Sequence, residues 1–186
     1  MPIDPPADDR TRILLTAADQ GSAQAAAHLT QGQQRMAHLL AGAAAGKLLY
    51  CRAYGWLTWT GSVWSADDGV AARNELFALL RRASRDADQD TVKAANSCMN
   101  DGPQRGVLSI ASHLPEFYVT LDQLDQDPYL LNLSNGTYDL HTGELRDHDP
   151  ADHLTKIARA AYEPEALGPV WDDHLEYFQP SLDVRE

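Results

Sequence analysis

Long apolar runs, paired cysteines and an excess of positive charge are all missing from this sequence of 186 residues. No run approaches the ~18 apolar residues that cross a bilayer, and no charged–apolar–small signal peptide opens the chain. The two cysteines, Cys51 and Cys98, lie far apart and form no CxxC unit. We therefore expect no membrane partner, no disulfide framework and no structural zinc, in a protein of the reducing cytoplasm.

Basic residues are scarce, because 15 Lys and Arg stand against 27 Asp and Glu. The formal net charge of −12 opposes strong non-specific binding of nucleic acid by the chain as a whole. Any contact with DNA would therefore come from a local basic face. The chain is long enough to bury the core of one domain.

The sequence does contain alternating helical and strand patterns along one domain. We expect a disordered, proline-rich lead-in over residues 1–15, a domain over 16–168 and a helical start of a linker over 169–186. Two small antiparallel β meanders are predicted at about 47–65 and 130–147. The order of these patterns is that of an α+β fold that is mainly helical.

The helical segments are marked by apolar periodicity and by Gly, Pro and Asn breaks. They are, in chain order, two helices in 16–45 broken near 30–32, then 70–85, 90–99, a break at 100–103, 105–113 and finally 169–178.

The predicted helix 70–85 has one apolar face and one basic face. Leu76, Leu80 and Ala83 share a face, with Phe77 and Leu79 flanking it. The concentrated basic patch of the chain lies opposite and consists of Arg81, Arg82 and Arg85, with Lys93 close in sequence. These side chains are candidates for binding DNA phosphates. The alternatives are a solvated face that pairs with neighbouring acids, or a face that meets an adjacent subunit.

Aromatic residues crowd the first meander, KLLYCRAYGWLTWTGSVW at 47–64: Tyr50, Tyr54, Trp56, Trp59 and Trp64. Exposed rings would stack on single-stranded bases, each worth ~1–3 kcal/mol. Aromatics at strand spacing more often fill the core of a sheet, so we expect core positions with one exposed ring at most.

The stretch LLNLSNGTYDLHTGELRDHDP at 130–150 predicts a folded ribbon. Asn135-Gly136 between two alternating runs indicates a hairpin with a type I′ turn, and Thr142-Gly143 indicates a second turn. The period of two predicts that the leucines and Tyr138 point inward. The side chains expected on the outer face are Asp139, His141, Glu144 and Arg146.

We find no catalytic or metal-binding pattern. GAAAGKL at 42–48 lacks one intervening residue and the hydroxyl of a Walker A loop, so we expect a Gly-rich helix end there. The His and Asp residues of 141–153 have no compact ligand spacing, and Asp149-Pro150 is expected to begin a helix. A small metal-dependent hydrolase that uses these side chains remains an alternative.

Several motifs accompany the two meanders. They are Leu130-Leu131-Asn132, Asn135-Gly136, Asp139-Leu140, Thr142-Gly143-Glu144-Leu145, His148-Asp149-Pro150 and Thr155-Lys156, preceded by Trp56, Trp59, Gly61 and Trp64. This pattern closely resembles the N-terminal domain that precedes the helicase in phage and plasmid primase–helicases, which is related to one in poxvirus primase–helicases. The resemblance spans roughly residues 40–183. We interpret the motif residues as structural.

The resemblance implies a role in DNA replication in a bacterial host. The parent proteins resemble ring-forming superfamily-three helicases, in which ATP and Mg would be bound by the motor domain. The domain itself would be non-enzymatic and would support DNA engagement or ring assembly. Its partners would be DNA, helicase and primase domains, or neighbouring protomers. A stand-alone adaptor or inhibitor that binds a replicative helicase is the alternative from another functional class.

Overall fold

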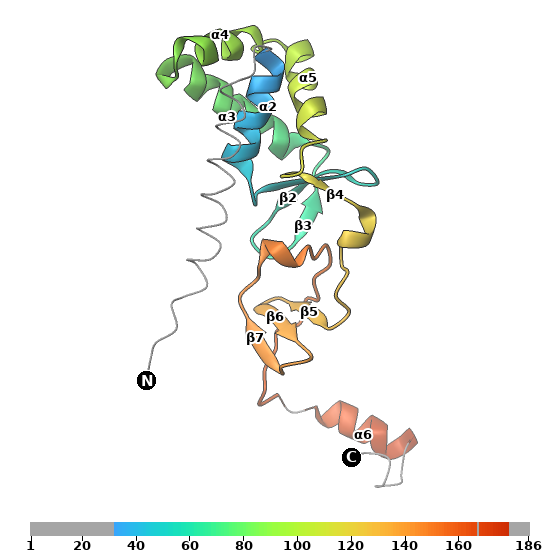
Figure 1. The fold of residues 1–186 in the computed structure, drawn as a ribbon. Coiled ribbons are helices and arrows are strands. Elements are labelled where there is room, and N and C mark those ends of the chain that lie inside the picture. Colours follow the sequence, from blue (N-terminus) through green and yellow to red (C-terminus); the bar gives the residue numbers. More distant parts are fainter. Residues whose placement is uncertain (1–31, 167, 179–186) are drawn as a thin grey trace.

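A computed structural model describes residues 32–166 and 168–178, and it confirms the α+β fold (Figure 1). Four helices gather at one end of the molecule: α2 (Gly32–Ala44), α3 (Val70–Asp86), α4 (Gln89–Ser97) and α5 (Asp101–Ala111). No described helix combines the length and apolar composition that a membrane span requires. The predicted lead-in and the first of the two helices expected in 16–45 lie outside the described residues.

The first meander forms a sheet, here called sheet A, as predicted. Its strands are β1 (Leu48–Cys51), β2 (Gly55–Trp59) and β3 (Trp64–Ala66), and the sheet order is β3-β2-β1-β4. β4 (Tyr118–Val119) pairs in parallel with β1 and was not predicted, because two residues carry no periodicity. Sheet A is therefore mixed rather than purely antiparallel.

Sheet A is covered on both faces. Leu48 belongs to the core under the helices, together with Met36, Leu40, Leu76, Leu80 and Phe117, and Tyr50 and Trp56 pack against that core. The alternate side chains of β1 and β2 face the other way and form a second core with Trp64, Val119 and Leu124. The sheet thus separates the helical bundle from the C-terminal half of the chain.

Two local predictions about helices need correction. The break expected at 100–103 is wrong, because α5 begins at Asp101 with Asn100 as its N-cap. Pro103 lies in the first turn of α5, where the missing N–H group has no helical acceptor to lose. The helix expected after Asp149-Pro150 is a single 3₁₀ turn, η2 (Pro150–Asp152), which ends at His153 with φ +52°. Another 3₁₀ turn, η1 (Leu121–Gln123), precedes the second meander.

The second meander forms a three-stranded antiparallel sheet, here called sheet B. Its strands are β5 (Leu130–Leu133), β6 (Gly136–Asp139) and β7 (Glu144–Arg146), in that order. The first hairpin is right but its turn was placed one residue too late, since Leu133 pairs with Gly136 and the loop is Ser134–Asn135. A type I′ turn requires a positive φ at both central residues. Asn135 does not have a positive φ, so the type I′ assignment is wrong.

The predicted faces of sheet B are right only in part: His141, Glu144 and Arg146 are exposed as expected, and Leu133 is buried. Leu131 and Leu145, expected to point inward, are 45% and 37% exposed, whereas Asn132 and Thr137 are only 5% and 1% exposed. The reason is a pair of long-range hydrogen bonds: Asn132 Nδ2 donates to the backbone oxygens of Ser62 and Lys156, each at 2.9 Å. Asn132 and Thr137 therefore lie against the rest of the protein. On the opposite face Leu131 and Leu145 are exposed, while Leu133 is buried and Tyr138 packs on Tyr162 of the following segment.

An extended segment, residues 154–162, here called the strap, covers the open edge of β5. Ala158 N donates to Asn132 O at 2.8 Å, and Ser134 N donates to Ala160 O at 3.0 Å. After the strap the chain reaches the last described helix, α6 (Pro169–Phe178), whose bounds match the prediction. Figure 1 shows α6 at the opposite end of the molecule from the helical bundle.

Candidate nucleic-acid interface

The candidate site is the exposed face of α3, whose first turn is held by the side chain of Asp67, two residues before the N-cap Gly69. Asp67 accepts hydrogen bonds from Gly69 N at 3.0 Å and Ala71 N at 2.7 Å, so backbone donors of the first turn are satisfied. The buried face consists of Ala72, Leu76, Leu79, Leu80 and Ala83, while Phe77 is 47% exposed. This burial fixes the rotation of α3 about its own axis and turns the arginines towards solvent.

Arg81, Arg82 and Arg85 lie exposed on the C-terminal half of α3. Within the described residues none of the three forms an ion pair. Their position near the helix C-terminus is electrostatically favourable, because the helix dipole stabilises cations there. The structure therefore holds three uncompensated positive charges within two turns of one helix.

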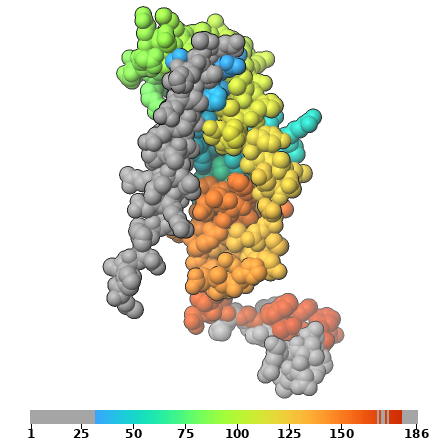
Figure 2. Space-filling model, in the orientation of Figure 1, coloured from blue at the N-terminus to red at the C-terminus, as the bar shows by residue number. Residues whose placement is uncertain are grey.

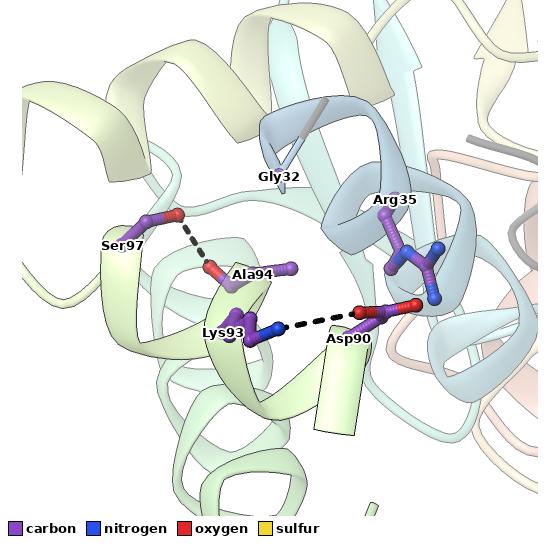
Figure 3. Close-up of a pocket in the computed structure, with 6 residues that line it drawn as sticks. All are labelled: Gly32, Arg35, Asp90, Lys93, Ala94 and Ser97. Atoms are coloured by element: carbon purple, nitrogen blue, oxygen red, sulfur yellow. Dashed lines mark hydrogen bonds and ion pairs between the residues drawn. The ribbon is translucent and has the colours of Figure 1, made fainter. Parts of the chain in front are cut away.

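Lys93 does not join this row, although it is close in sequence. It lies on α4 and forms an ion pair with Asp90, with Nζ and Oδ1 3.7 Å apart. Figure 3 shows both side chains in a hollow of about 360 Å³ that is also lined by Gly32, Arg35, Ala94 and Ser97. The positive charge of Lys93 is thus largely offset by its neighbour.

A second hollow, of about 380 Å³, lies beside the arginines. Arg82 is at its rim, and Leu39, Leu79, Ala83 and Ala87 provide apolar lining, with Asp86, Asp88 and Thr91 as the polar members. Asp88 is occupied as the N-cap of α4, where it accepts from Asp90 N and Thr91 N. The Thr91 hydroxyl also donates to the Asp88 carboxylate, at 2.7 Å. That hydrogen bond has the largest effect, and together with the two backbone hydrogen bonds it lowers the pKa of the Asp88 carboxyl.

The aromatic residues of the first meander are mainly core residues. Trp64 is buried, and Trp56 and Trp59 are half-buried and pack against the two cores. Trp56 contacts Tyr50 and Phe117 edge to face, with ring centroids 5.4 and 5.3 Å apart. Only Tyr54, in the turn between β1 and β2, has a ring that is more than half exposed among the five. Base stacking by this group is therefore limited to Tyr54.

The motif residues of the second meander make contacts that join distant segments. Trp64 Nε1 donates to Pro150 O at 2.9 Å, which links sheet A to η2. Asn135 holds the backbone of Tyr162 with two hydrogen bonds, one donated and one accepted. Asp139 Oδ1 accepts from His141 N and Thr142 N, and Gly143, at φ +72°, completes that turn. These contacts support a structural interpretation of the motif.

Thr155 and Lys156 anchor the start of the strap to Asp125. The Asp125 carboxylate accepts from Thr155 N at 2.7 Å and Thr155 Oγ1 at 2.5 Å, and Lys156 Nζ lies 3.4 Å away. Partial burial alone would raise the pKa of Asp125, but the hydrogen bonds from Thr155 and the Lys156 charge outweigh it and lower the pKa. Sequence periodicity had no signal for this contact, because 30 residues separate the partners.

The described residues contain no cluster of three or more His, Cys, Asp and Glu side chains arranged to hold a metal ion. GAAAGKL forms the end of α2, a turn with Gly46 at φ +72° and the start of β1. The order helix–turn–strand is the reverse of a phosphate-binding loop.

Comparison with known proteins gives two results. The family model described as "D5 N terminal like" matches residues 33–180, which include both meanders and the helical bundle. The protein described as "Putative helicase 184R" of Invertebrate iridescent virus 6 is 29% identical over 69 residues. Those residues are 37% of this chain but 7% of the viral protein, so the chain spans only a small part of that relative's length.

Proposed function

Because the chain belongs to the D5 N-terminal-like family, we propose that it is the non-catalytic N-terminal domain of a replicative primase–helicase and that it engages DNA through α3. The family is that of N-terminal domains of primase–helicases, which confirms the resemblance drawn from the motif. In this proposal the ATP and Mg chemistry belongs to a motor domain of the parent protein. The domain contributes affinity for DNA and so couples the motor domain to the DNA.

The observation that carries the DNA contact is that three cations without an ion pair stand within five residues of one helix. Lys47, Arg52 and Arg159 also form no ion pair within the described residues, but they are far apart in the sequence. Six described cations each lie within 4 Å of an aspartate: Arg35, Arg73, Lys93, Arg105, Arg146 and Lys156. In a chain of net charge −12, the row Arg81, Arg82 and Arg85 stays uncompensated. An exposed basic row on an acidic protein concentrates the attraction for phosphates on one face.

The test compares two variants that each remove two positive charges. Arg81→Ala/Arg85→Ala removes charges one helical turn apart in the row. Arg73→Ala/Arg105→Ala removes two charges that Asp101 already compensates, at 2.9 and 2.7 Å. Fluorescence anisotropy with a labelled single strand at low salt should show at least about tenfold weaker binding for the first variant only.

Equal losses in the two variants would mean that net charge alone governs binding, and the α3 site would be wrong. Absence of DNA binding by the wild-type chain, together with binding to a replicative helicase, would instead favour the adaptor or inhibitor function.

A further inference from the structure

The hollow of about 380 Å³ beside the arginines lies where α2, α3 and α4 meet. Leu79 and Ala83 of its lining belong to the buried core of the bundle, and Leu39 and Ala87 pack against that core. Core packing therefore fixes the apolar walls before any ligand arrives. Figure 2 shows the surface of α3 and α4, in green, at the end of the molecule away from the C-terminal half.

Arg82 and Asp86 supply the polar groups that the hollow can offer to a ligand. Both side chains are exposed, and neither forms an ion pair within the described residues. They are four residues apart on α3 with the cation first, which is the less favourable order for a helical ion pair. The other polar members are occupied, because the Asp88 carboxylate caps α4 and the Thr91 hydroxyl donates to it. The rim thus offers one strong donor and one strong acceptor.

The chemistry of the hollow favours a neutral ring and disfavours an anion. Apolar walls give a charged group no hydrogen bonds, and the Asp86 carboxylate repels phosphate. A flat aromatic ring buries its faces against such walls while its polar edge reaches the rim. The volume is near the lower end of the range for small-molecule sites, ~300–1,000 Å³, which suits one ring system. A carboxylate is also the group that accepts from an exocyclic amine, such as that of cytosine.

We propose that this hollow takes up one unpaired nucleobase that carries an exocyclic amine, beside the phosphates held by the row Arg81, Arg82 and Arg85. Asp86 accepts a hydrogen bond from the amine, and Arg82, at the rim, contacts the phosphate of the same nucleotide. In a duplex the base is stacked and its amine is paired, so entry would require the base to be extruded. The ligand is therefore single-stranded DNA. This inference rests on the proposed DNA contact at α3 and names the form of DNA that the site binds.

The experiment measures fluorescence anisotropy at low salt with three labelled single strands of equal length. They are oligo(dC), oligo(dT) and an abasic strand, which keeps the phosphates but has no bases. The wild-type chain should bind oligo(dC) at least about fivefold more tightly than the abasic strand, because a base packed in a protein site contributes that much or more. It should also prefer oligo(dC) to oligo(dT) by about threefold or more, because thymine has no exocyclic amine.

Ala87→Leu fills the hollow and leaves every charge in place. Ala87 is half-buried, with φ −94° and ψ 173°, a backbone conformation that leucine adopts readily. The variant should bind oligo(dC) only as tightly as the abasic strand, and its affinity for the abasic strand should equal that of the wild type. Ala66→Leu makes the same change at an exposed position of β3 outside the hollow, and it should keep the wild-type ratio. Circular dichroism confirms that both variants are folded.

Asp86→Ala separates recognition of the base from repulsion of the phosphates. Asp86 is exposed and is the last residue of α3, so its removal leaves the core unchanged. Loss of one negative charge should raise the affinity for all three strands. The preference for oligo(dC) over oligo(dT) should nevertheless disappear, because the acceptor for the amine is gone. A preference that persists at the wild-type ratio would overturn the assignment of Asp86.

Equal affinity of the wild-type chain for oligo(dC) and the abasic strand would overturn this inference and leave the DNA contact of α3 intact. Wild-type affinity of Ala87→Leu for oligo(dC) would overturn it as well. Absence of binding to all three strands would contradict the proposed function itself, and this inference would fall with it. The two failures are therefore distinguishable in one set of measurements.

Discussion

Three polar side chains, Asn132, Asn135 and Thr155, hold the strap in place. Their partners along the chain lie 24, 27 and 30 residues away. Asn132 is buried and Thr155 is half-buried, and a hydrogen bond is costlier to leave unmade where water is excluded. The Asn132 amide nitrogen is bonded, whereas its Oδ1 has no partner within the described residues. These residues therefore explain why a small sheet with a polar inner face is stable, although burial of polar groups ordinarily opposes folding.

Thr155→Val tests this role at one atom. The substitution preserves shape but removes the hydroxyl donor to Asp125, whose pKa in the folded protein lies below its ordinary value of 3.8. Such a carboxylate stabilises the fold at pH values above its unfolded pKa, and the contribution is lost as pH falls through the folded pKa. We expect the variant to lose about 1–2 kcal/mol of unfolding free energy at neutral pH. Urea unfolding measures the loss.

The same difference should shrink as the pH falls through the folded pKa of Asp125, which lies below 3.8, because the carboxylate is then protonated in the folded wild-type protein. Thr142→Val is the control, since the Thr142 hydroxyl has no hydrogen-bond partner within the described residues. A difference between wild type and Thr155→Val that stays constant down to about pH 3 would show that the hydroxyl does not act through the Asp125 carboxylate.

At the scale of elements, sheet B depends on a close approach between β6 and β7. Gly136 has φ +150°, and a Cβ atom there would lie 2.5 Å from the backbone oxygen of Arg146. Gly136→Ala should therefore destabilise the protein by about 2–3 kcal/mol, through backbone strain and overpacking. At Gly143, φ is +72° and a Cβ atom would meet only Tyr138 Oη, at 3.7 Å. Gly143→Ala should cost about 1 kcal/mol, and equal losses in thermal unfolding would contradict the account.

The elements themselves were largely predictable from local patterns. The helix expected at 70–85 runs from Val70 to Asp86, and the final helix has the expected bounds. Helical periodicity and capping residues act within a few positions, so the sequence carries them directly. The parallel pairing of β4 and the start of α5 at Asp101 were missed. The first depends on a distant strand, and the second on a proline that is tolerated only because it lies in a first turn.

The orientation of sheet B shows a different limit of prediction. Alternation correctly grouped Leu131, Leu133, Tyr138 and Leu145 on one face. It could not say which face would be buried, because that depends on the acceptors that Ser62 and Lys156 offer to Asn132. For the candidate site, the amphipathic pattern placed the arginines of α3 on an exposed face. It did not separate Lys93 from them, although Asp90 lies three residues earlier in the same predicted helix, a spacing that already indicates an ion pair.

At the scale of the whole molecule, charge and apolar surface are distributed unevenly. The uncompensated arginines lie on the helical bundle, and the exposed leucines of sheet B and α6 lie towards the other end (Figure 1). If DNA binds to α3 as proposed, this distribution restricts binding to one orientation, because most of the surface of a protein of net charge −12 repels phosphate.

The most direct test of the DNA contact is the salt dependence of the affinity for single-stranded DNA. Three neutralised phosphates predict a slope of about −2 in a plot of log affinity against log salt concentration. The Arg81→Ala/Arg82→Ala/Arg85→Ala variant should lose both the affinity and the slope. Unchanged affinity and slope in this triple variant would contradict the proposal that α3 is the DNA-binding face.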